Sequence, residues 1–205
     1  MSNEKRMADH YEIISAFRIG DKEVVFGQDK NCDKPYFCAL YEKEVVLCYT
    51  RERYEDCCTG DDYIAMMELY ADRIKGQCLK VREEWDRVTV PREPVTAEMC
   101  FSNDYHECIK GKVVAVKLCM LRPEYRSADH QLLYVTGGFG AEANARGNAC
   151  FCINLYTGEE ARWERFELQG EVRPECVPAW AKKRLKIVQR ELSERKRKAS
   201  AKEER

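Results

Sequence analysis

The sequence contains no long hydrophobic run and no secretory-type start, and these two absences narrow the classes of protein to which it can belong. No apolar stretch approaches the length of about 20 residues that a membrane-spanning helix needs. The first residues, 1–10, are polar and charged, whereas a secretory signal has a basic start followed by an apolar stretch. We therefore expect a soluble, cytoplasmic protein that does not associate with a membrane.

Catalytic motifs are also missing, because no P-loop, nucleophile elbow or HExxH sequence is present. Residues 103–108 bring an acid, an imidazole and a thiol close together in the sequence, but this does not show that their side chains converge. We interpret Asp129 and His130 as polar residues that precede the next predicted strand. The sequence does not favour an enzyme, so we predict no catalytic residue and no cofactor. A catalytic site assembled from residues that are distant in sequence is left as an alternative.

Cysteine is abundant, with 12 residues, yet no C-x-x-C pair occurs. Without a secretory signal we expect these cysteines to be thiols rather than disulfides. Cys150 and Cys152 alternate along a predicted strand, which favours small buried hydrophobic side chains. Zinc sites usually have paired ligands two to four residues apart, so we predict no metal site. Apart from the adjacent pair at 57–58, the weak candidates are Cys100, His106 and Cys108.

The composition predicts a folded chain of class α+β. Of the 205 residues, 44% are hydrophobic and 35% are charged, which provides enough apolar surface to offset ordering entropy. We expect three parts: a β-meander with one packed helix at 1–90, a mainly β part at 91–177, and a basic C-terminal helix and tail at 178–205. The division at residue 90 rests on Pro91 and Pro94, which disfavour a continuing helix or a central strand.

Strand-forming runs occur in both halves of the chain. In the first half they predict about four strands, at 11–19, 23–27, 36–40 and 45–49. In the second half they predict a small antiparallel sheet or partly open barrel, with strands at 109–118, 131–136, 148–155 and 161–168.

A loop is expected at residues 57–60, and a long helix is predicted after Asp61 and Asp62, whose side chains suit a helix N-terminus. Apolar residues recur at spacings of three and four and form one stripe that can cover the strands. These residues are Tyr63, Met67, Tyr70, Ile74, Cys78, Val81 and Trp85.

Residues 135–147 contain a glycine-rich loop. Gly138, Gly140 and Ala143 nominally fit a dinucleotide-binding fingerprint. The next predicted strand follows too soon for the crossover helix that a parallel βαβ unit needs, so we reject that interpretation. We expect Gly137, Gly138 and Gly140 to shape a structural loop between antiparallel strands. An intermediate alternative is that the loop, with Arg146, contacts a phosphate or a partner.

The C-terminal segment carries a concentrated positive charge. Residues 181–205 contain 11 Lys and Arg against 4 Glu, a net +7, which leaves −8 for the rest of a chain whose total is −1. Apolar residues predict that the helix docks as far as Leu192, and one interpretation of the charge is simply a solvated helix that frays beyond this residue. We predict that this arm binds an acidic protein or nucleic acid, with Lys182, Lys183, Arg184 and Arg190 available for contact.

Arg162 and Arg165 flank Trp163 in a predicted strand and are candidates for a second contact surface. An exposed Trp beside Arg can stack on a base, although a Trp in a strand more often packs in the core. We favour the packing interpretation for Trp163.

The second half of the chain resembles uncharacterised accessory proteins of Firmicute plasmids, integrative elements and prophages. The resemblance is carried mainly by residues 96–100, 109–112, 121–125, 135–140 and 161–165, and a looser similarity covers the N-terminal strands and helix. It implies a protein of a mobile genetic element, for which anti-defence activity, including an anti-CRISPR role, and element maintenance are both plausible. It supplies no catalytic residue.

These observations support one leading hypothesis and two alternatives. The leading one is a non-enzymatic accessory protein that binds and interferes with a host protein or nucleoprotein complex. The alternatives are a nucleic-acid-binding regulator and a nuclease or other enzyme acting on nucleic acid. The sequence makes no prediction of oligomeric state.

Overall fold

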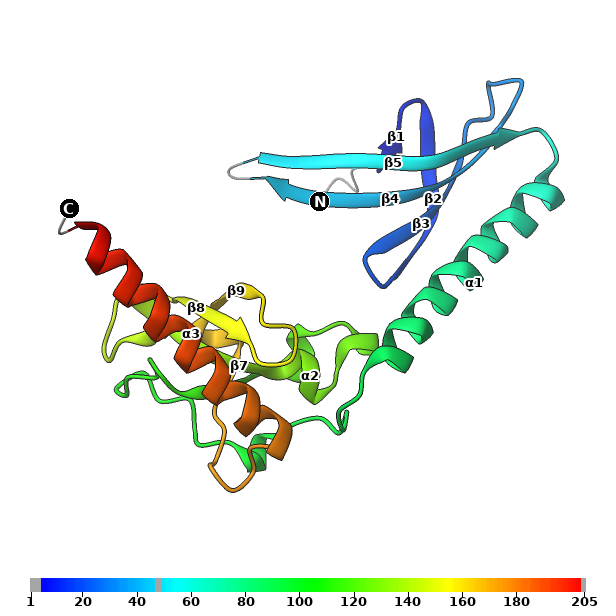
Figure 1. The fold of residues 1–205 in the computed structure, drawn as a ribbon. Coiled ribbons are helices and arrows are strands. Elements are labelled where there is room, and N and C mark those ends of the chain that lie inside the picture. Colours follow the sequence, from blue (N-terminus) through cyan, green and yellow to red (C-terminus); the bar gives the residue numbers. More distant parts are fainter. Residues whose placement is uncertain (1–4, 47–48, 204–205) are drawn as a thin grey trace. The chain divides into compact units, whose positions relative to one another are not determined.

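The computed structural model describes residues 5–46 and 49–203, which form two compact units (Figure 1). The first unit is Met1–Val88 and the second is Thr89–Arg205. The helix of the expected third part, 178–205, lies within the second unit. Within the described residues, no helix is both long enough and apolar enough to cross a membrane. Each unit has its own sheet and its own long helix, as the α+β prediction requires.

The first unit is a five-stranded antiparallel sheet that curls into a half-barrel (Figure 1). Its strands follow the order of the sequence. They are β1 Met7–Ala8, β2 Tyr11–Ile19, β3 Lys22–Gln28, β4 Tyr36–Val46 and β5 Tyr49–Gly60. The β-branched and aromatic residues of β3 and β4 pack on both faces, because Val25 joins one apolar cluster while Val24 and Phe26 join the other.

Two predictions for this sheet need correction. The runs at 36–40 and 45–49 were expected to be separate strands. Instead, β4 continues from the first run as far as Val46 in the second. The polar residues between the runs remain in the sheet because they pair with β5, as Glu42 does with Arg53. Residues 57–60 were expected to form a loop, yet they complete β5. Leu47 and Cys48 of the second run lie outside the described residues.

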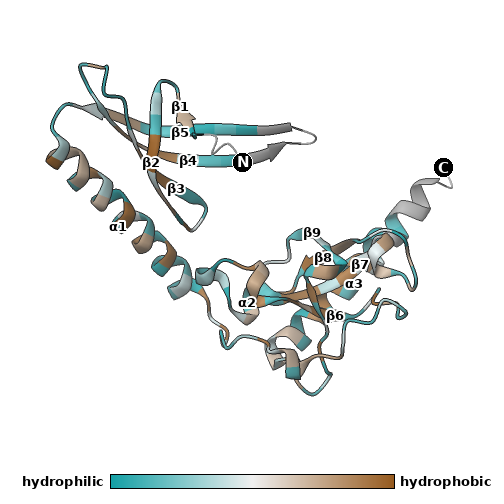
Figure 2. Ribbon diagram, turned by 180° about the vertical axis from the view of Figure 1, so that it is seen from behind, coloured by the Kyte–Doolittle hydropathy of each residue, from teal (hydrophilic) through white to brown (hydrophobic). Residues whose placement is uncertain are grey.

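Helix α1, Tyr63–Arg87, covers one face of the first sheet. Its start is confirmed, because the carboxylate of Asp62 accepts hydrogen bonds from the backbone N–H groups of Ile64 and Ala65 at 2.8 and 3.2 Å. Apolar and polar residues alternate along the helix in Figure 2. The buried residues of the helix are Met66, Tyr70, Gln77 and Val81. Tyr63 and Cys78, which belong to the predicted stripe, are exposed, so the buried stripe is rotated relative to the predicted one.

The second unit contains a five-stranded antiparallel sheet with the order β10-β6-β7-β8-β9. Its strands are β6 Val113–Val116, β7 Leu132–Gly137, β8 Ala149–Asn154, β9 Glu160–Glu164 and β10 Leu168–Glu171. The short helix η1 Ala97–Met99 precedes them, and between them lie η2 Leu118–Met120, η3 Pro123–Tyr125, α2 Ala128–Gln131, η4 Phe139–Ala141 and η5 Arg165–Glu167. The small antiparallel sheet was predicted, whereas β10 and its pairing with β6 were not.

Helix α3, Ala179–Glu203, packs on one face of this second sheet (Figure 1). Ala181 and Val188 are buried in the same apolar cluster as residues from β6, β7 and β8, and Trp180, Leu185 and Leu192 pack against it. The predicted docking as far as Leu192 is therefore confirmed. The helix does not end there, since its backbone remains helical as far as Glu203.

The opposite face of the second sheet carries its own apolar cluster, in which Cys150 and Cys152 of β8 are buried together. Their alternation was predicted to place them on one face, and the structure confirms it. Trp163 also packs against this cluster, which agrees with the packing interpretation of that residue.

Candidate functional site

Two adjoining hollows lie where α3 crosses the second sheet, and together we call them the α3 groove. One hollow, of about 340 Å³, is lined by Thr136, Phe151, Cys152, Ile153, Glu160, Ala161, Arg162 and Leu192. The other, of about 390 Å³, is lined by Lys110, Gly111, Tyr134, Val135, Thr136, Gln189, Leu192 and Ser193. Thr136 and Leu192 line both hollows. The α3 groove therefore begins where the docked part of the helix ends.

Phe151 supplies an exposed aromatic side chain in the α3 groove. It lies in β8 between Cys150 and Cys152, which are buried on the opposite face, so strand alternation directs Phe151 toward the face that α3 covers. Its side chain nevertheless remains 53% exposed. Phe151 was not among the predicted contact residues, although the alternation that identified the two cysteines also places it on the opposite face of the strand.

Charged side chains of both signs border the α3 groove. Arg162, one of the predicted contact residues, is exposed and pairs with Glu164 at 2.5 Å. Glu160 pairs across to Arg195 of α3 at 3.2 Å. The surface around Phe151 therefore combines an apolar centre with a mixed, hydrated edge, which is the usual composition of a protein-binding patch.

The predicted basic residues of α3 differ in their availability. Lys182, Lys183 and Arg190 are exposed. Arg184 is half-buried and its Nε donates to the backbone oxygen of Leu155 at 3.3 Å, so it helps to hold the helix on the sheet. The first turns of α3 thus present charge outward while their apolar side is docked.

Arg165 corrects the sequence-based prediction, because it is not a surface contact residue. It is 1% exposed and begins the 3-10 helix η5 instead of continuing the strand. Its Nη1 donates to the Gly140 oxygen at 3.2 Å, and its Nη2 donates to the oxygens of Asp104 and Glu107 at 2.7 and 3.3 Å. These bonds commit the guanidinium to the interior, so Arg165 is unavailable to a partner.

The glycine-rich loop joins two antiparallel strands, β7 and β8, and its fold explains the glycines. Gly138 has φ +99°, a conformation that side chains disfavour. A Cβ at Gly138 or at Gly140 would overlap the backbone oxygens of Ala149 and Asn148, respectively. Gly137 has open space around it. Arg146 is exposed in the same loop and remains a candidate for contact.

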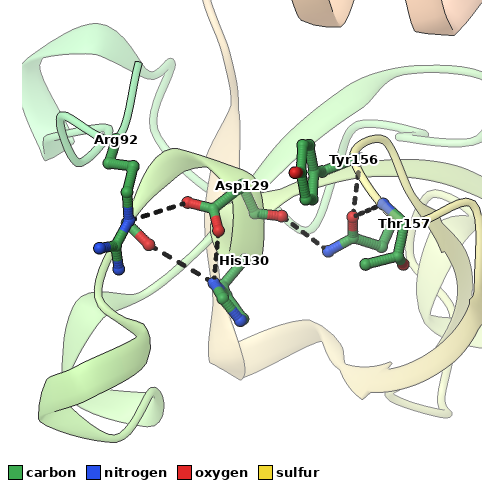
Figure 3. A network of polar contacts seen from close by, with 7 residues as sticks. Arg92, Asp129, His130, Tyr156 and Thr157 are labelled. Atoms are coloured by element: carbon green, nitrogen blue, oxygen red, sulfur yellow. Dashed lines mark hydrogen bonds and ion pairs between the residues drawn. The ribbon is translucent and has the colours of Figure 1, made fainter. Parts of the chain in front are cut away.

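A polar cluster at α2 has the residue types of a hydrolytic site but not its geometry (Figure 3). Asp129, which is 1% exposed, places Oδ2 2.9 Å from Nδ1 of His130 and Oδ1 3.9 Å from Nε of Arg92. Ser127 Oγ lies 3.4 Å from the same His130 nitrogen. A catalytic relay needs the acid and the nucleophile on opposite nitrogens of the imidazole. The cluster is therefore a structural polar network.

Electrostatics within this cluster keep Asp129 ionised. Burial alone would raise the pKa of Asp129, but hydrogen bonds with His130 and Ser127, together with the charge of His130, outweigh it and lower the pKa. The backbone oxygen of Asp129 also accepts a bond from the side chain of Asn154 at 3.0 Å (Figure 3). The cluster thus ties α2 to the end of β8.

The three weak metal candidates do not form one group. Cys100 is buried in the apolar cluster under α3, and burial raises its pKa to about 11. His106 and Cys108 are exposed, and they contact Asn144 and Glu142 at 2.6 and 3.5 Å. Within the described ranges, no three His, Cys, Asp or Glu residues are arranged to hold a metal ion.

No family model, curated protein or solved structure matches this chain.

Proposed function

We propose that this protein is a non-enzymatic accessory factor of a mobile genetic element that binds an acidic surface of a host protein through the α3 groove. Interference with that host protein, including an anti-defence role, is the activity that such binding would serve. The mobile-element context comes from the resemblance of residues 96–100, 109–112, 121–125, 135–140 and 161–165. The coincidence of an exposed aromatic residue with the undocked, basic end of α3 is the structural observation that carries the proposal.

Phe151 is the expected anchor of this interaction. Its half-exposed ring lies in a hollow together with Ile153 and Leu192, so a partner side chain can bury apolar area there. The basic residues beyond Leu192 then add attraction for carboxylates, which raises the rate of association more than the affinity itself.

The carboxylates of the α3 groove favour a protein partner over nucleic acid. Glu160 lines the first hollow, and Glu164 pairs with Arg162 beside it. A nucleic-acid backbone carries a charge on every phosphate and would bring several of them near these carboxylates, whereas an acidic protein surface can leave an apolar residue opposite them. An acidic protein surface can instead compete for Arg162 and Arg195 through individual carboxylates while placing an apolar residue in the hollow.

The test compares capture by three immobilised proteins from a nuclease-treated Firmicute lysate: wild type, Phe151→Glu and Phe166→Glu. Phe166 is the matched control, because it is 48% exposed in η5 and does not line the groove. A captured protein is then produced separately and titrated against all three. We expect saturable binding at a fixed stoichiometry that Phe151→Glu abolishes and Phe166→Glu retains.

Two results would overturn the proposal. One is equal binding of the captured protein by all three immobilised proteins. The other is retention of nucleic acid alone, with an affinity that falls steeply with salt and does not depend on Phe151, which would favour the nucleic-acid-binding alternative. Time-dependent degradation of purified RNA or DNA would favour the enzyme alternative.

A further inference from the structure

Two cysteines of the first unit lie directly opposite each other on adjacent strands. Cys38 of β4 and Cys58 of β5 are register partners in the antiparallel sheet. Residues paired in this way direct their side chains to the same face of the sheet. Cys38 is buried in the apolar cluster between the sheet and α1, and Cys58 packs against the same cluster. Residues 57–60 were expected to form a loop, so this pairing did not follow from the sequence.

The spacing of paired residues in an antiparallel sheet suits a disulfide bond. The Cα atoms of directly opposite residues lie about 4.5–5.5 Å apart. A disulfide usually joins Cα atoms that are about 4.4–6.8 Å apart, so a bond between the two sulfurs requires little movement of the backbone. Cys38 and Cys58 are both free thiols in this structure. The same sheet can therefore hold the pair in its reduced form and in its cross-linked form.

Arg73 of α1 contacts both sulfur atoms with one guanidinium group. Its Nη1 donates to Sγ of Cys38 at 3.5 Å, and its Nη2 donates to Sγ of Cys58 at 3.2 Å. The two nitrogens belong to one rigid planar group, so atoms that accept from both of them must be neighbours. The side-chain contacts thus agree with the strand register in placing the two sulfurs together.

A β-bulge beside Cys58 gives Arg73 a third acceptor. Asp56 and Cys57 of β5 together lie opposite Ala39 of β4, where the register shifts. Asp56 has φ +50°, a left-handed conformation that Asp tolerates better than most residues. Its backbone oxygen accepts a hydrogen bond from Nη2 of Arg73. Since this bond involves no sulfur, the guanidinium has an acceptor in either redox state of the pair.

The two thiols differ in burial, and this difference assigns their order of reaction. Cys38 is fully buried. Burial raises the pKa of Cys38, and the charge of Arg73 and its hydrogen bond offset only part of this effect. Cys58 is only half-buried, so a solute as small as a peroxide can reach its sulfur. We therefore expect Cys58 to meet an oxidant first and Cys38 to react with the product.

We propose that Cys38 and Cys58 are a reversible redox pair that closes to a disulfide when a hydroperoxide oxidises Cys58. The Cys58 sulfur attacks one oxygen of hydrogen peroxide, the O–O bond breaks, and a sulfenic acid forms while the other oxygen leaves as water with the thiol proton. Cys38 then attacks the Cys58 sulfur. The S–S bond forms, the S–O bond breaks, and the oxygen leaves as a second water with the Cys38 proton. Two thiols and one peroxide thereby give one disulfide and two waters.

The same residues do not suit a zinc ion. A structural zinc site has four ligands, most often thiolates and imidazoles. Arg73 instead directs a positive charge at the two sulfurs that would have to bind the ion. Across residues 5–46 and 49–203, no group of three His, Cys, Asp or Glu side chains is arranged to hold a metal. Oxidation is therefore the chemistry that this pair of thiols supports.

The test treats the reduced, full-length protein with an equimolar amount of hydrogen peroxide, alkylates the remaining thiols and maps disulfides by mass spectrometry after digestion without reduction. Trypsin leaves Cys32 with Cys38 and Cys57 with Cys58, so the variants Cys32→Ser and Cys57→Ser assign the linkage. We expect the Cys38–Cys58 bond in both variants and in wild type, formed about tenfold faster than any disulfide of the exposed Cys57 or Cys78. Dithiothreitol should reverse it.

Two further variants test the order of reaction and the role of Arg73. In Cys38→Ser, the sulfenic acid has no thiol to close on, so dimedone should label Cys58. Arg73→Gln removes the charge that faces the reacting sulfurs and should slow disulfide formation about fivefold. Lys75→Gln is the matched control, because Lys75 is exposed on the same helix, and it should keep the wild-type rate. Circular dichroism checks that each variant keeps its helices.

Three results would overturn the proposal. The first is oxidation of Cys57 or Cys78 in the wild type while Cys38 and Cys58 remain open to alkylation on unfolding. The second is dimedone labelling of Cys57 and not Cys58 in the Cys38→Ser variant. The third is an equal rate of disulfide formation in the Arg73→Gln protein and its control. The first result needs no variant, so it stands whether or not a substitution disturbs the fold, and none of the three depends on the α3 groove.

Discussion

Arg165 and Asn103 donate hydrogen bonds to each other in the second unit. Arg165 Nε donates to Oδ1 of Asn103 at 2.7 Å, and Asn103 Nδ2 donates back to the backbone oxygen of Arg165 at 2.8 Å and to that of Leu168 at 3.0 Å. The Arg165 guanidinium donates to the side-chain oxygen of Asn103 and to backbone oxygens. Among the described residues it forms no ion pair. One buried side chain thereby joins the segment before β6, the glycine-rich loop and η5.

The first prediction follows from these hydrogen bonds of Arg165. Arg165→Met should lower the free energy of unfolding of the second unit by about 3 kcal/mol, because it leaves several buried oxygens without donors. Arg162→Met, an exposed change in the same segment, should alter it by less than about 0.5 kcal/mol. Urea unfolding followed by tryptophan fluorescence, in a Trp85→Phe background, reports the second unit through Trp163 and Trp180. Equal stability of the two variants would contradict this role for Arg165.

The glycine-rich loop gives a second prediction with a built-in control. Gly138→Ala should destabilise the second unit by about 2 kcal/mol, because Gly138 has φ +99° and a Cβ would meet the Ala149 oxygen. Gly137→Ala should be nearly neutral, since nothing lies within 4 Å of the added Cβ. Gly138→Val and Gly140→Val should be more damaging still. A variant at Gly138 that keeps wild-type stability but loses partner binding would instead make the loop a binding site.

How much of this architecture was predictable depended on the range of the interactions. Strands with dense β-branched sequence were found, as was the α1 cap at Asp62, because alternation and capping are local signals. The strand Leu168–Glu171 was missed because it has little β-forming sequence of its own and pairs with β6, far away in the chain. The burial of Arg165 was missed because its acceptors come from residues that are distant in sequence.

The candidate surfaces show the same division. Exposed Lys182, Lys183 and Arg190 followed from helical periodicity. The α3 groove did not, because it requires knowing where α3 stops covering the sheet.

A third prediction concerns the basic arm. Deleting residues 194–205 should leave the melting temperature of the second unit nearly unchanged, because the docked side chains end at Leu192. The same deletion should weaken binding of an acidic partner, most strongly at low salt, where exposed charges are least screened. Leu185→Ala should have the opposite profile, with a stability loss of about 2 kcal/mol. A large stability loss from the deletion, without any change in binding, would make the arm a structural element.

The polar cluster at α2 gives a pH prediction. Because the pKa of Asp129 is lowered in the folded protein, its stabilising contribution is present above the unfolded value of about 3.9 and is lost as the pH falls through the folded pKa. Asp129→Asn should therefore reduce stability at neutral pH and flatten the loss of stability toward acid. Urea unfolding across this pH range tests it, with Glu175→Gln as the exposed control. Parallel curves for Asp129→Asn and wild type would contradict the prediction.

Thiol accessibility gives the fifth prediction. Burial raises the pKa of Cys100 to about 11 and that of Cys152 to about 12, so neither should react with iodoacetamide in the native protein at pH 8. The exposed Cys57 and Cys78 should react under the same conditions. After unfolding, all 12 cysteines should be alkylated. Stoichiometric zinc, or a majority of cysteines that need reduction first, would contradict the thiol interpretation.

The hydrogen bonds of Arg165 also have an evolutionary consequence. Arg165 binds the backbone oxygen of Gly140 and the side chain of Asn103, and a Cβ at Gly140 would overlap the backbone of Asn148, so a change at one of these three residues is difficult to compensate by altering a side chain elsewhere. Homologues that retain the second unit should therefore keep Asn103, Gly140 and Arg165 even where overall identity is low. Phe151, which is 53% exposed in the α3 groove, is not held in this way, so we expect it to vary more freely than these three residues.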